Sequence, residues 1–215
     1  MPAEVKICGL STPETVDAAI AAGADLIGLV FYPKSPRNVT LEQASALAER
    51  ARGRARIVTL VVDADDALLR AIVEGVDPDL IQAHGSESPE RIAEIARLTG
   101  KPVIKAIRVR DDADIAAAAD YSTVASLILY DAKAPETLGN ALPGGNGHAF
   151  DWGLLEGERR PAFMLAGGLT PENVAEAIRV TGAPVVDVSS GVESAPGVKD
   201  IGLIRKFIEA AKAAR

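Results

Sequence analysis

Two side chains in this sequence stand where acid–base chemistry would need them, at the ends of short apolar runs. Asp131 follows the apolar residues 127–130, so it enters from the edge of the core, where desolvation favours the neutral carboxyl that a general acid requires. Cys8, the only cysteine, ends the run 5–8 and precedes a glycine that lets the backbone turn. A lone buried cysteine is more often a small core residue, and an aspartate at such a place is equally often a helix cap or half of a structural ion pair. Their roles therefore depend on the elements that position them.

Both residues lie in a pattern that repeats from end to end: a short apolar run, a turn, and an alanine-rich amphipathic segment. The apolar runs predict strands at residues 5–8, 26–30, 57–62, 80–84, 103–107, 127–130, 162–166 and 185–188. The amphipathic segments predict helices that begin near Pro13, Leu41, Asp66, Pro89, Asp111, Trp152, Pro171 and Asp200. At Thr12, Ser88 and Thr170 a hydroxyl residue precedes Pro-Glu, which predicts an N-cap followed by proline at the first helical position.

This alternation of strands and helices predicts a parallel sheet, because each crossover returns the chain to the same end. Such units close naturally into a (β/α)8 barrel, the α/β fold that we predict, with a doubly wound sheet as the alternative. The segment from Thr12 resembles the segment from Thr170, and an internal helix–strand repeat favours the barrel. We predict one barrel domain over residues 1–215, with a long functional loop at the glycine-rich residues 134–147.

The composition is that of an ordinary globular protein, with 48% apolar and 25% charged residues. The net charge of −7 argues against nonspecific nucleic-acid binding, which needs a basic face. No apolar run approaches the length of a membrane span, the N-terminus has no secretory pattern, and one cysteine excludes an internal disulfide framework. We therefore predict a cytoplasmic protein with no nucleic-acid or membrane partner, and a monomer, with a homodimer as the alternative.

Period-two alternation along the first strand decides where Cys8 points. If the apolar first and third residues of 5–8 face the helices, then Lys6 and Cys8 face the barrel interior. A buried lysine needs a partner, and Asp187 on the adjoining last strand is the candidate; otherwise Lys6 would extend its amine to solvent from the start of the strand. Catalytic groups of such barrels lie at the carboxyl ends of the strands, so Cys8 and Asp131 are predicted to share one mouth.

The loops after the last two strands predict a phosphate-binding site. Gly167 and Gly168 let the backbone approach closely, and Ser189, Ser190 and Gly191 supply N–H groups and hydroxyls. Two such turns in consecutive loops, where barrels often bind phosphate, favour a phosphate site over turns that serve only geometry. A helix N-terminus nearby would add its positive dipole end.

Other polar residues follow the second to fifth strands and are predicted at the same mouth: Arg37, Asp63, His84 and Arg108. Arg37 has the planar geometry to hold a carboxylate with two hydrogen bonds, although an isolated loop arginine is usually solvated. His84 taken alone is more often a structural histidine. The residues predicted to bind substrate are Lys6, Arg37, His84 and Asp187. With two histidines and no spaced ligand cluster we predict no metal site, and no cofactor.

Six motifs spread over essentially the whole chain carry a resemblance: VKICGL at 5–10, GLVFYPKSPR at 28–37, QAHG at 82–85, FDW at 150–152, LAGGL at 165–169 and VDVSSGVE at 186–193. Their order and spacing resemble those of the phosphoribosylanthranilate isomerase family of tryptophan biosynthesis. The chain departs from the family at Ala83, where leucine is usual, and at Asn146 and His148 in the glycine-rich loop. We expect a packing adjustment at the first position and an effect on rate or loop behaviour at the other two.

The resemblance implies an Amadori rearrangement of N-(5-phosphoribosyl)anthranilate to 1-(2-carboxyphenylamino)-1-deoxyribulose 5-phosphate. It assigns the general acid to Asp131, which would protonate the furanose ring oxygen, and the general base to Cys8, which would remove the C2 proton. Arg37 would hold the anthranilate carboxylate, Asp187 would contact the sugar hydroxyls, and the two late loops would hold the phosphate. Positive charge such as that of Lys6 would favour the thiolate that a cysteine base needs.

Other phosphate-binding barrels are the rival interpretations. A ribulose-phosphate epimerase uses metal-binding histidines that this sequence lacks, a histidine-pathway isomerase pairs two aspartates, and indole-glycerol-phosphate synthase uses lysine and glutamate. A non-catalytic sugar-phosphate binder would need neither Cys8 nor Asp131. Whether the histidine-pathway aminoaldose is also accepted stays open.

Overall fold

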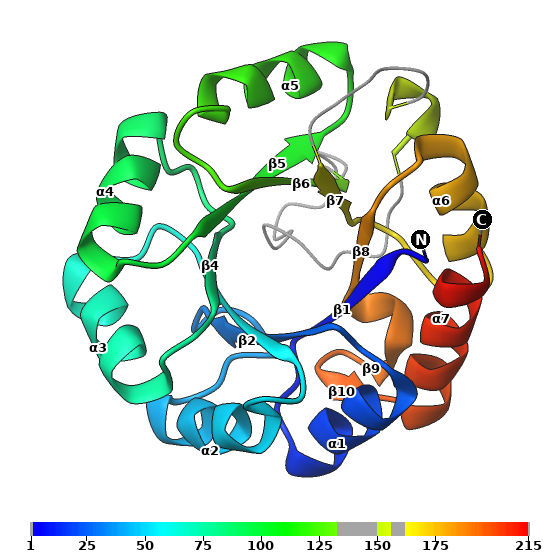
Figure 1. Cartoon of the computed structure of the whole chain (residues 1–215), viewed down its shortest axis with the longest axis horizontal. Coiled ribbons are helices and arrows are strands. Elements are labelled where there is room, and N and C mark those ends of the chain that lie inside the picture. The colour runs from blue at the N-terminus through cyan, green and yellow to red at the C-terminus, as the bar shows by residue number, and fades with distance from the viewer. Residues whose placement is uncertain (1, 133–149, 156–161, 215) are drawn as a thin grey trace.

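The computed structural model describes residues 2–132, 150–155 and 162–214, and there the chain forms a closed barrel of eight parallel strands inside a ring of helices (Figure 1). The strands follow one another around the barrel in chain order, and β8 pairs with β1 to close it. The predicted (β/α)8 barrel is confirmed, and the doubly wound alternative is wrong.

The barrel strands lie close to the predicted apolar runs. They are β1 Glu4–Cys8, β2 Leu26–Phe31, β3 Arg56–Val61, β4 Leu80–Ala83, β5 Val103–Val109, β6 Leu127–Ala132, β7 Phe163–Leu165 and β8 Val185–Val188. The sixth strand continues past its apolar run, so Asp131 is a strand residue whose orientation is fixed by the sheet. Cys8 is the last residue of β1, as predicted.

Seven α-helices are present in the described ranges: α1 Pro13–Ala22, α2 Leu41–Ala51, α3 Asp66–Val76, α4 Pro89–Thr99, α5 Asp112–Ala116, α6 Val174–Thr181 and α7 Ile201–Ala213. A 3₁₀ helix at Ala117–Tyr121 extends α5, and another at Trp152–Leu155 stands where the sixth full helix was predicted. The N-caps predicted at Thr12 and Ser88 are confirmed, since each side chain accepts a hydrogen bond from a backbone N–H of the first turn.

The N-cap predicted at Thr170 is wrong, because α6 begins only at Val174. The side chain of Asn173 accepts from the backbone N–H of Thr170 at 2.7 Å and donates to the carbonyl of Gly168 at 2.9 Å. These local side-chain bonds offer the backbone a turn in place of the first helical turn.

Alternation along the strands separates two apolar clusters. Outward-facing strand residues such as Ile7, Ile27 and Val186 pack against the helices in the larger cluster. Inward-facing residues such as Leu129 and Met164 fill the middle of the barrel in a smaller one. The barrel interior is thus a packed core, and only its carboxyl end is left for polar side chains. Ala83 faces outward, as predicted, and is fully buried in the larger cluster.

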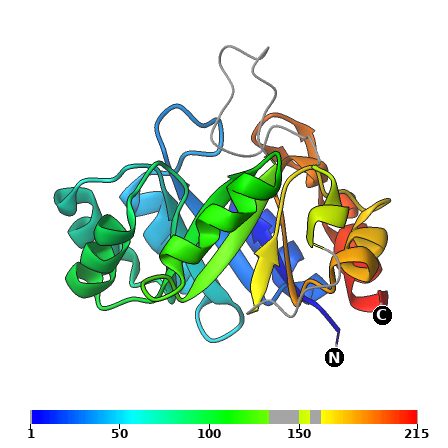
Figure 2. The ribbon, with the colours of Figure 1, turned by 90° about the horizontal axis from the view of Figure 1, so that it is seen from above.

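A feature that was not predicted follows β8. The chain forms a two-stranded antiparallel ribbon of β9 Glu193–Ala195 and β10 Val198–Lys199 before α7 begins. Figure 2 shows this segment, in orange, at the same end of the barrel as the blue loop after β2.

No helix in the described part of the chain combines the length and the apolar character that a membrane crossing requires.

Candidate active site

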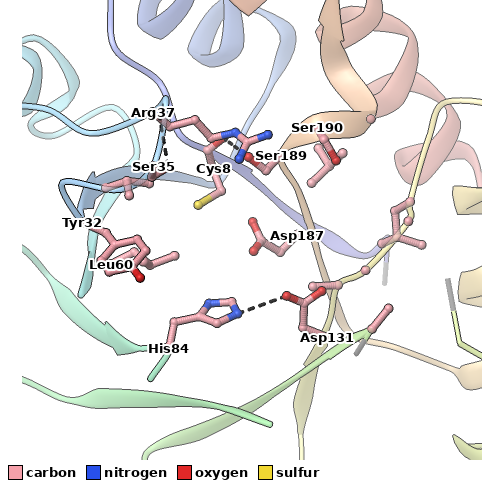
Figure 3. Close-up of a pocket in the computed structure, with 18 of the residues that line it drawn as sticks. Cys8, Tyr32, Ser35, Arg37, Leu60, His84, Asp131, Asp187, Ser189 and Ser190 are labelled. Carbon is pink, nitrogen blue, oxygen red and sulfur yellow. Dashed lines mark hydrogen bonds and ion pairs between the residues drawn. The ribbon is translucent and has the colours of Figure 1, made fainter. Parts of the chain in front are cut away.

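A cavity lies at the carboxyl end of the barrel, and together with the open solvent at its mouth it spans about 750 Å³. Ten predicted site residues line it: Cys8, Arg37, His84, Asp131, Gly167, Gly168, Asp187, Ser189, Ser190 and Gly191. Figure 3 shows their side chains arranged around one space, with Cys8 and Asp131 on different sides of it. The strand order therefore brings together residues that are far apart in the sequence.

The thiol of Cys8 enters the cavity beside a glycine that makes room for it. A Cβ atom on Gly28, the register partner of Cys8 on β2, would lie 2.9 Å from Sγ, closer than side chains pack. Burial raises the pKa of the Cys8 thiol above its ordinary value. The positive charges of Lys6 and Lys199 act in the opposite direction, but they do not outweigh burial, and Asp187 adds to the increase. Lys6 does lower the pKa of the thiol, as predicted, but the net shift is upward, so the neutral thiol is the resting form.

We expect this raised pKa to appear in the pH dependence of Cys8 alkylation. Because only the thiolate reacts, the rate with iodoacetamide should rise by about tenfold per pH unit and keep rising past the pH at which glutathione levels off. The measurement is the mass shift of the intact protein, which has one cysteine, with glutathione as the control. A rate that levels off below the ordinary thiol range would contradict the assignment.

Lys6 lies just below the cavity and holds Asp187 in place. The two residues are register partners on β1 and β8, and the Lys6 Nζ atom donates to Oδ1 of Asp187 at 3.0 Å. The Lys6 side chain is completely buried, which confirms the predicted inward orientation and the predicted partner. Burial alone would lower the pKa of Lys6, but the neighbouring Asp187 carboxylate and Cys8 outweigh it, so the net shift is upward and the ammonium form persists.

A chain of buried hydrogen bonds joins Asp131 to His84, which directly follows β4, and through it to Gln82 in β4. Oδ2 of Asp131 lies 3.0 Å from Nε2 of His84, and the Nδ1 atom of the same ring lies 2.9 Å from the amide nitrogen of Gln82. All three side chains are buried. Figure 3 shows the His84–Asp131 contact on the floor of the site. His84 is therefore a partner of the predicted acid, a role that its sequence position did not reveal.

Arg37 reaches over the cavity, and its guanidinium is held by a residue to which no role was assigned from the sequence. Nε and Nη2 of Arg37 donate to the two carboxylate oxygens of Glu193 at 2.7 and 2.8 Å. Glu193 also accepts from Nζ of Lys199 at 2.7 Å, and Lys199 donates to the backbone oxygen of Ser189 at 2.8 Å. Desolvation lowers the pKa of Lys199, although Glu193 counteracts it. The Pro-Gly dipeptide at 196–197 is a turn signal that could have indicated the ribbon carrying Glu193 and Lys199.

Replacing Glu193 by glutamine is expected to lower the free energy of unfolding by about 3 kcal/mol, because it leaves a buried lysine without its counter-charge. The measurement is urea unfolding at neutral pH. Glu209→Gln, on the exposed face of α7, is the matched control and should leave the midpoint unchanged. Equal midpoints for the two variants would show that Glu193 contributes nothing to the ribbon.

The two late loops complete the wall of the cavity, and Ser189 lies beside Arg37 (Figure 3). Gly167 and Gly168 both have left-handed backbone, with φ of 86° and 64°, and a Cβ atom on Gly167 would lie 2.3 Å from the backbone nitrogen of Ala132. The hydroxyl of Ser189 donates to the carbonyl of Cys8 at 3.2 Å, which ties this loop to β1. The helix that begins here is a 3₁₀ turn at Ser190–Val192, too short to add a helix dipole.

Some predicted mouth residues are not part of the cavity. Asp63 is exposed, and its carboxylate accepts from the backbone N–H of Ser86 at 2.7 Å, which closes the turn after β4; Arg108 is also exposed. The predicted loop 134–147, with Asn146 and His148, lies outside the described residues. Within the described ranges no cluster of histidine, cysteine, aspartate or glutamate has the geometry to hold a metal ion.

A closed parallel barrel that gathers a thiol, carboxylates, an imidazole and an arginine at the carboxyl ends of its strands belongs to the class of (β/α)8-barrel enzymes. Comparison with known families defines the class further. Residues 5–210 match the family model described as N-(5'phosphoribosyl)anthranilate (PRA) isomerase, so the chain belongs to this isomerase family.

Individual relatives agree with this assignment. An N-(5'-phosphoribosyl)anthranilate isomerase of Rhodopseudomonas palustris strain BisA53 is 59% identical over 214 residues, which is 99% of this chain and 97% of that one. The crystal structure of phosphoribosyl anthranilate isomerase from Thermotoga maritima superimposes with a TM-score of 0.86 at 36% identity, covering 98% of both chains. A structure of phosphoribosyl anthranilate isomerase in complex with reduced 1-(o-carboxyphenylamino)-1-deoxyribulose 5-phosphate has a TM-score of 0.84 at 34% identity, again over 98% of both chains.

Proposed function

We propose that this chain converts N-(5'-phosphoribosyl)anthranilate to 1-(2-carboxyphenylamino)-1-deoxyribulose 5-phosphate in tryptophan biosynthesis, with Asp131 as the general acid and Cys8 as the general base. The observation that carries the proposal is that both side chains line one cavity, on different sides of it, together with the two glycine- and serine-rich loops. An aldose-to-ketose shift needs an acid and a base that reach different atoms of one bound sugar.

The first step opens the sugar ring. Asp131 gives its proton to the ring oxygen, the bond between this oxygen and C1 breaks, and the lone pair of the anthranilate nitrogen forms the C1=N bond of a Schiff base. The carboxyl of Asp131 is buried at the carboxyl end of β6 and lines the cavity. His84 Nε2 next to Oδ2 helps to fix the direction of the other oxygen.

The second step moves the carbonyl. Cys8 acts as the thiolate after its own proton has been released to solvent through the open cavity. The thiolate removes the proton from C2, and the electrons of that C–H bond form C1=C2 while the C=N electrons return to nitrogen. The resulting enolamine tautomerises: the C2 hydroxyl loses its proton, C1 gains one, and the ketone forms at C2. Atoms and electrons balance without an external oxidant, so acid–base groups of the protein are sufficient.

The remaining residues hold the substrate. Arg37, positioned by Glu193, lines the cavity and would bind the anthranilate carboxylate. Asp187, neutralised on one oxygen by Lys6, is placed to accept from sugar hydroxyls. Backbone N–H groups of the loops at 167–168 and 189–191 and the hydroxyl of Ser190 would bind the phosphate.

The direct test is turnover. Phosphoribosylanthranilate is generated in situ from anthranilate, and its loss is followed by fluorescence with catalytic amounts of protein. The proposal requires disappearance at a rate proportional to enzyme concentration. No turnover under conditions where the Thermotoga maritima enzyme is active would refute the proposed reaction. The same preparation offered the histidine-pathway aminoaldose decides whether that substrate is also accepted.

A further inference from the structure

One buried residue of the site has no part in the mechanism described so far. Gln82 lies on β4, two residues deeper in the barrel than His84, and is fully buried. It is absent from the cavity lining among the described residues, and its amide nitrogen lies 2.9 Å from Nδ1 of His84. Any influence of Gln82 on the reacting groups therefore passes through the imidazole ring to Asp131.

The orientation of the Gln82 amide decides which ring nitrogen of His84 carries the proton. When the NH₂ group donates to Nδ1, this nitrogen must offer its lone pair, so the neutral ring carries its proton on Nε2 and donates to Oδ2 of Asp131. When the amide is turned over, its oxygen accepts from an Nδ1–H group. In the neutral ring Nε2 then accepts a hydrogen bond from a protonated Asp131. In the imidazolium ion Nε2 carries a proton of its own and donates it to Asp131.

The polar atoms around Gln82 favour the first orientation. Among the described residues, Oε1 of Gln82 has no hydrogen-bond partner, so no donor is available at that position. Turning the amide over would pair the oxygen with an Nδ1–H group, and both N–H groups of the buried amide would then need acceptors at the place where Oε1 now lies. Buried N–H groups without a partner are rarer than carbonyl oxygens without one. The orientation with NH₂ toward His84 pairs one N–H group with Nδ1 and leaves one N–H group and Oε1 without a described partner.

We propose that Gln82 is a positioning residue that holds His84 as the neutral Nε2–H tautomer, and so keeps the proton of Asp131 on Oδ1. Oδ2 accepts from His84 and has no room for a proton on that side. Oδ1 accepts no hydrogen bond from a described residue, and Asp131 lines the cavity, so Oδ1 is the atom that meets the substrate. With the amide reversed, the same proton would lie between Oδ2 and Nε2, away from the sugar ring. The inference rests on the proposed function, because it concerns the proton that Asp131 delivers.

The tautomer can be measured without turnover. The chain has two histidines, so a His148→Gln variant labelled with ¹⁵N leaves His84 as the only source of imidazole signals. Two-bond ¹H–¹⁵N spectra identify which nitrogen is protonated. We expect a protonated Nε2 and an unprotonated Nδ1 at neutral pH. A ring protonated on Nδ1, alone or together with Nε2, would overturn the inference.

Gln82→Glu tests the same idea by changing one atom. A carboxylate at this position can only accept, so it selects a ring with a proton on Nδ1. We expect the spectrum to show this proton, kcat to fall by about tenfold or more, and KM to stay within about threefold, because Gln82 does not line the cavity. Gln43→Glu, on the exposed side of α2, is the matched control and should change neither constant.

The outcomes separate the inference from the proposed function. An unchanged kcat in Gln82→Glu, with the Nδ1 proton visible, would refute the positioning role while the enzyme remained active. An inactive wild-type protein would refute the proposed reaction, and the role of Gln82 with it. Should Gln82→Glu not fold, the wild-type spectrum alone still decides the tautomer.

Discussion

Replacing Cys8 by alanine is expected to lower kcat for phosphoribosylanthranilate by at least about 10²-fold, the usual scale of a lost general base. The substitution removes only Sγ from a buried strand end, so the barrel loses little packing, and the Lys6–Asp187 pair beneath it keeps both partners. KM should change by no more than about threefold, because the carboxylate and phosphate contacts are made by other residues. The measurement is steady-state fluorescence with the substrate generated in situ.

Cys8→Ser and a substrate deuterated at C2 show whether the lost step is proton removal from carbon. A serine hydroxyl keeps the shape but is a far weaker base near neutral pH, so C2–H cleavage should become rate-limiting and show a primary isotope effect on kcat. The wild-type protein with the same substrate is the control. A Cys8→Ala or Cys8→Ser variant with full activity would remove Cys8 from the mechanism, and its thiol would then be a small core residue at the barrel mouth.

The barrel and its mouth were accessible from the sequence because they depend on short-range patterns. Alternation of apolar and polar residues placed Lys6 and Cys8 inside, and the ring closure that follows from parallel strands placed Asp187 beside Lys6. The tight turn at Gly167 and Gly168 was predictable because glycine is the residue type that most readily adopts a left-handed backbone. These inferences need only the strand period and the order of the strands.

The contacts that tune the site were not accessible, because they depend on side chains from distant segments. Glu193 was part of a quoted motif and Lys199 lies across a local turn from it, yet its other cationic partner, Arg37, comes from the loop after β2, which no local pattern joins to the ribbon. The effect of burial on Cys8 likewise outweighs the charge of Lys6 by a margin that composition does not reveal. The Thr170 cap failed for a related reason, since the Asn173 side chain supplied a competing turn.

The arrangement divides the charges of the mouth into two groups with different tasks. Lys6 neutralises Asp187 at the base of the cavity, and Glu193 stands between Arg37 and Lys199 at its rim. Arg37, Glu193 and Lys199 thus combine two cationic side chains with one carboxylate in a chain whose formal charge is −7. Local donors therefore oppose the unfavourable overall field, as binding of a carboxylate and a phosphate requires.

Replacing Asp131 by asparagine is expected to lower kcat by about 10²- to 10⁴-fold, because the amide keeps the shape of the carboxyl but has no proton acidic enough to give to the ring oxygen. An asparagine oxygen can still accept from His84 Nε2, so the buried chain of hydrogen bonds stays intact. Ring opening should then limit the rate, and deuterium at C2 should produce no isotope effect, which is the opposite of the result expected for Cys8→Ser.

Binding of the reduced open-chain product analogue separates catalysis from recognition in this variant. The analogue has no ring to open, so Asp131→Asn should bind it within about threefold of wild type, as measured by calorimetry. A large loss of analogue affinity would show that Asp131 holds the sugar rather than protonates it. An isotope effect equal to that of Cys8→Ser would show that both residues act on the C2 proton, and the assignment of separate acid and base would fail.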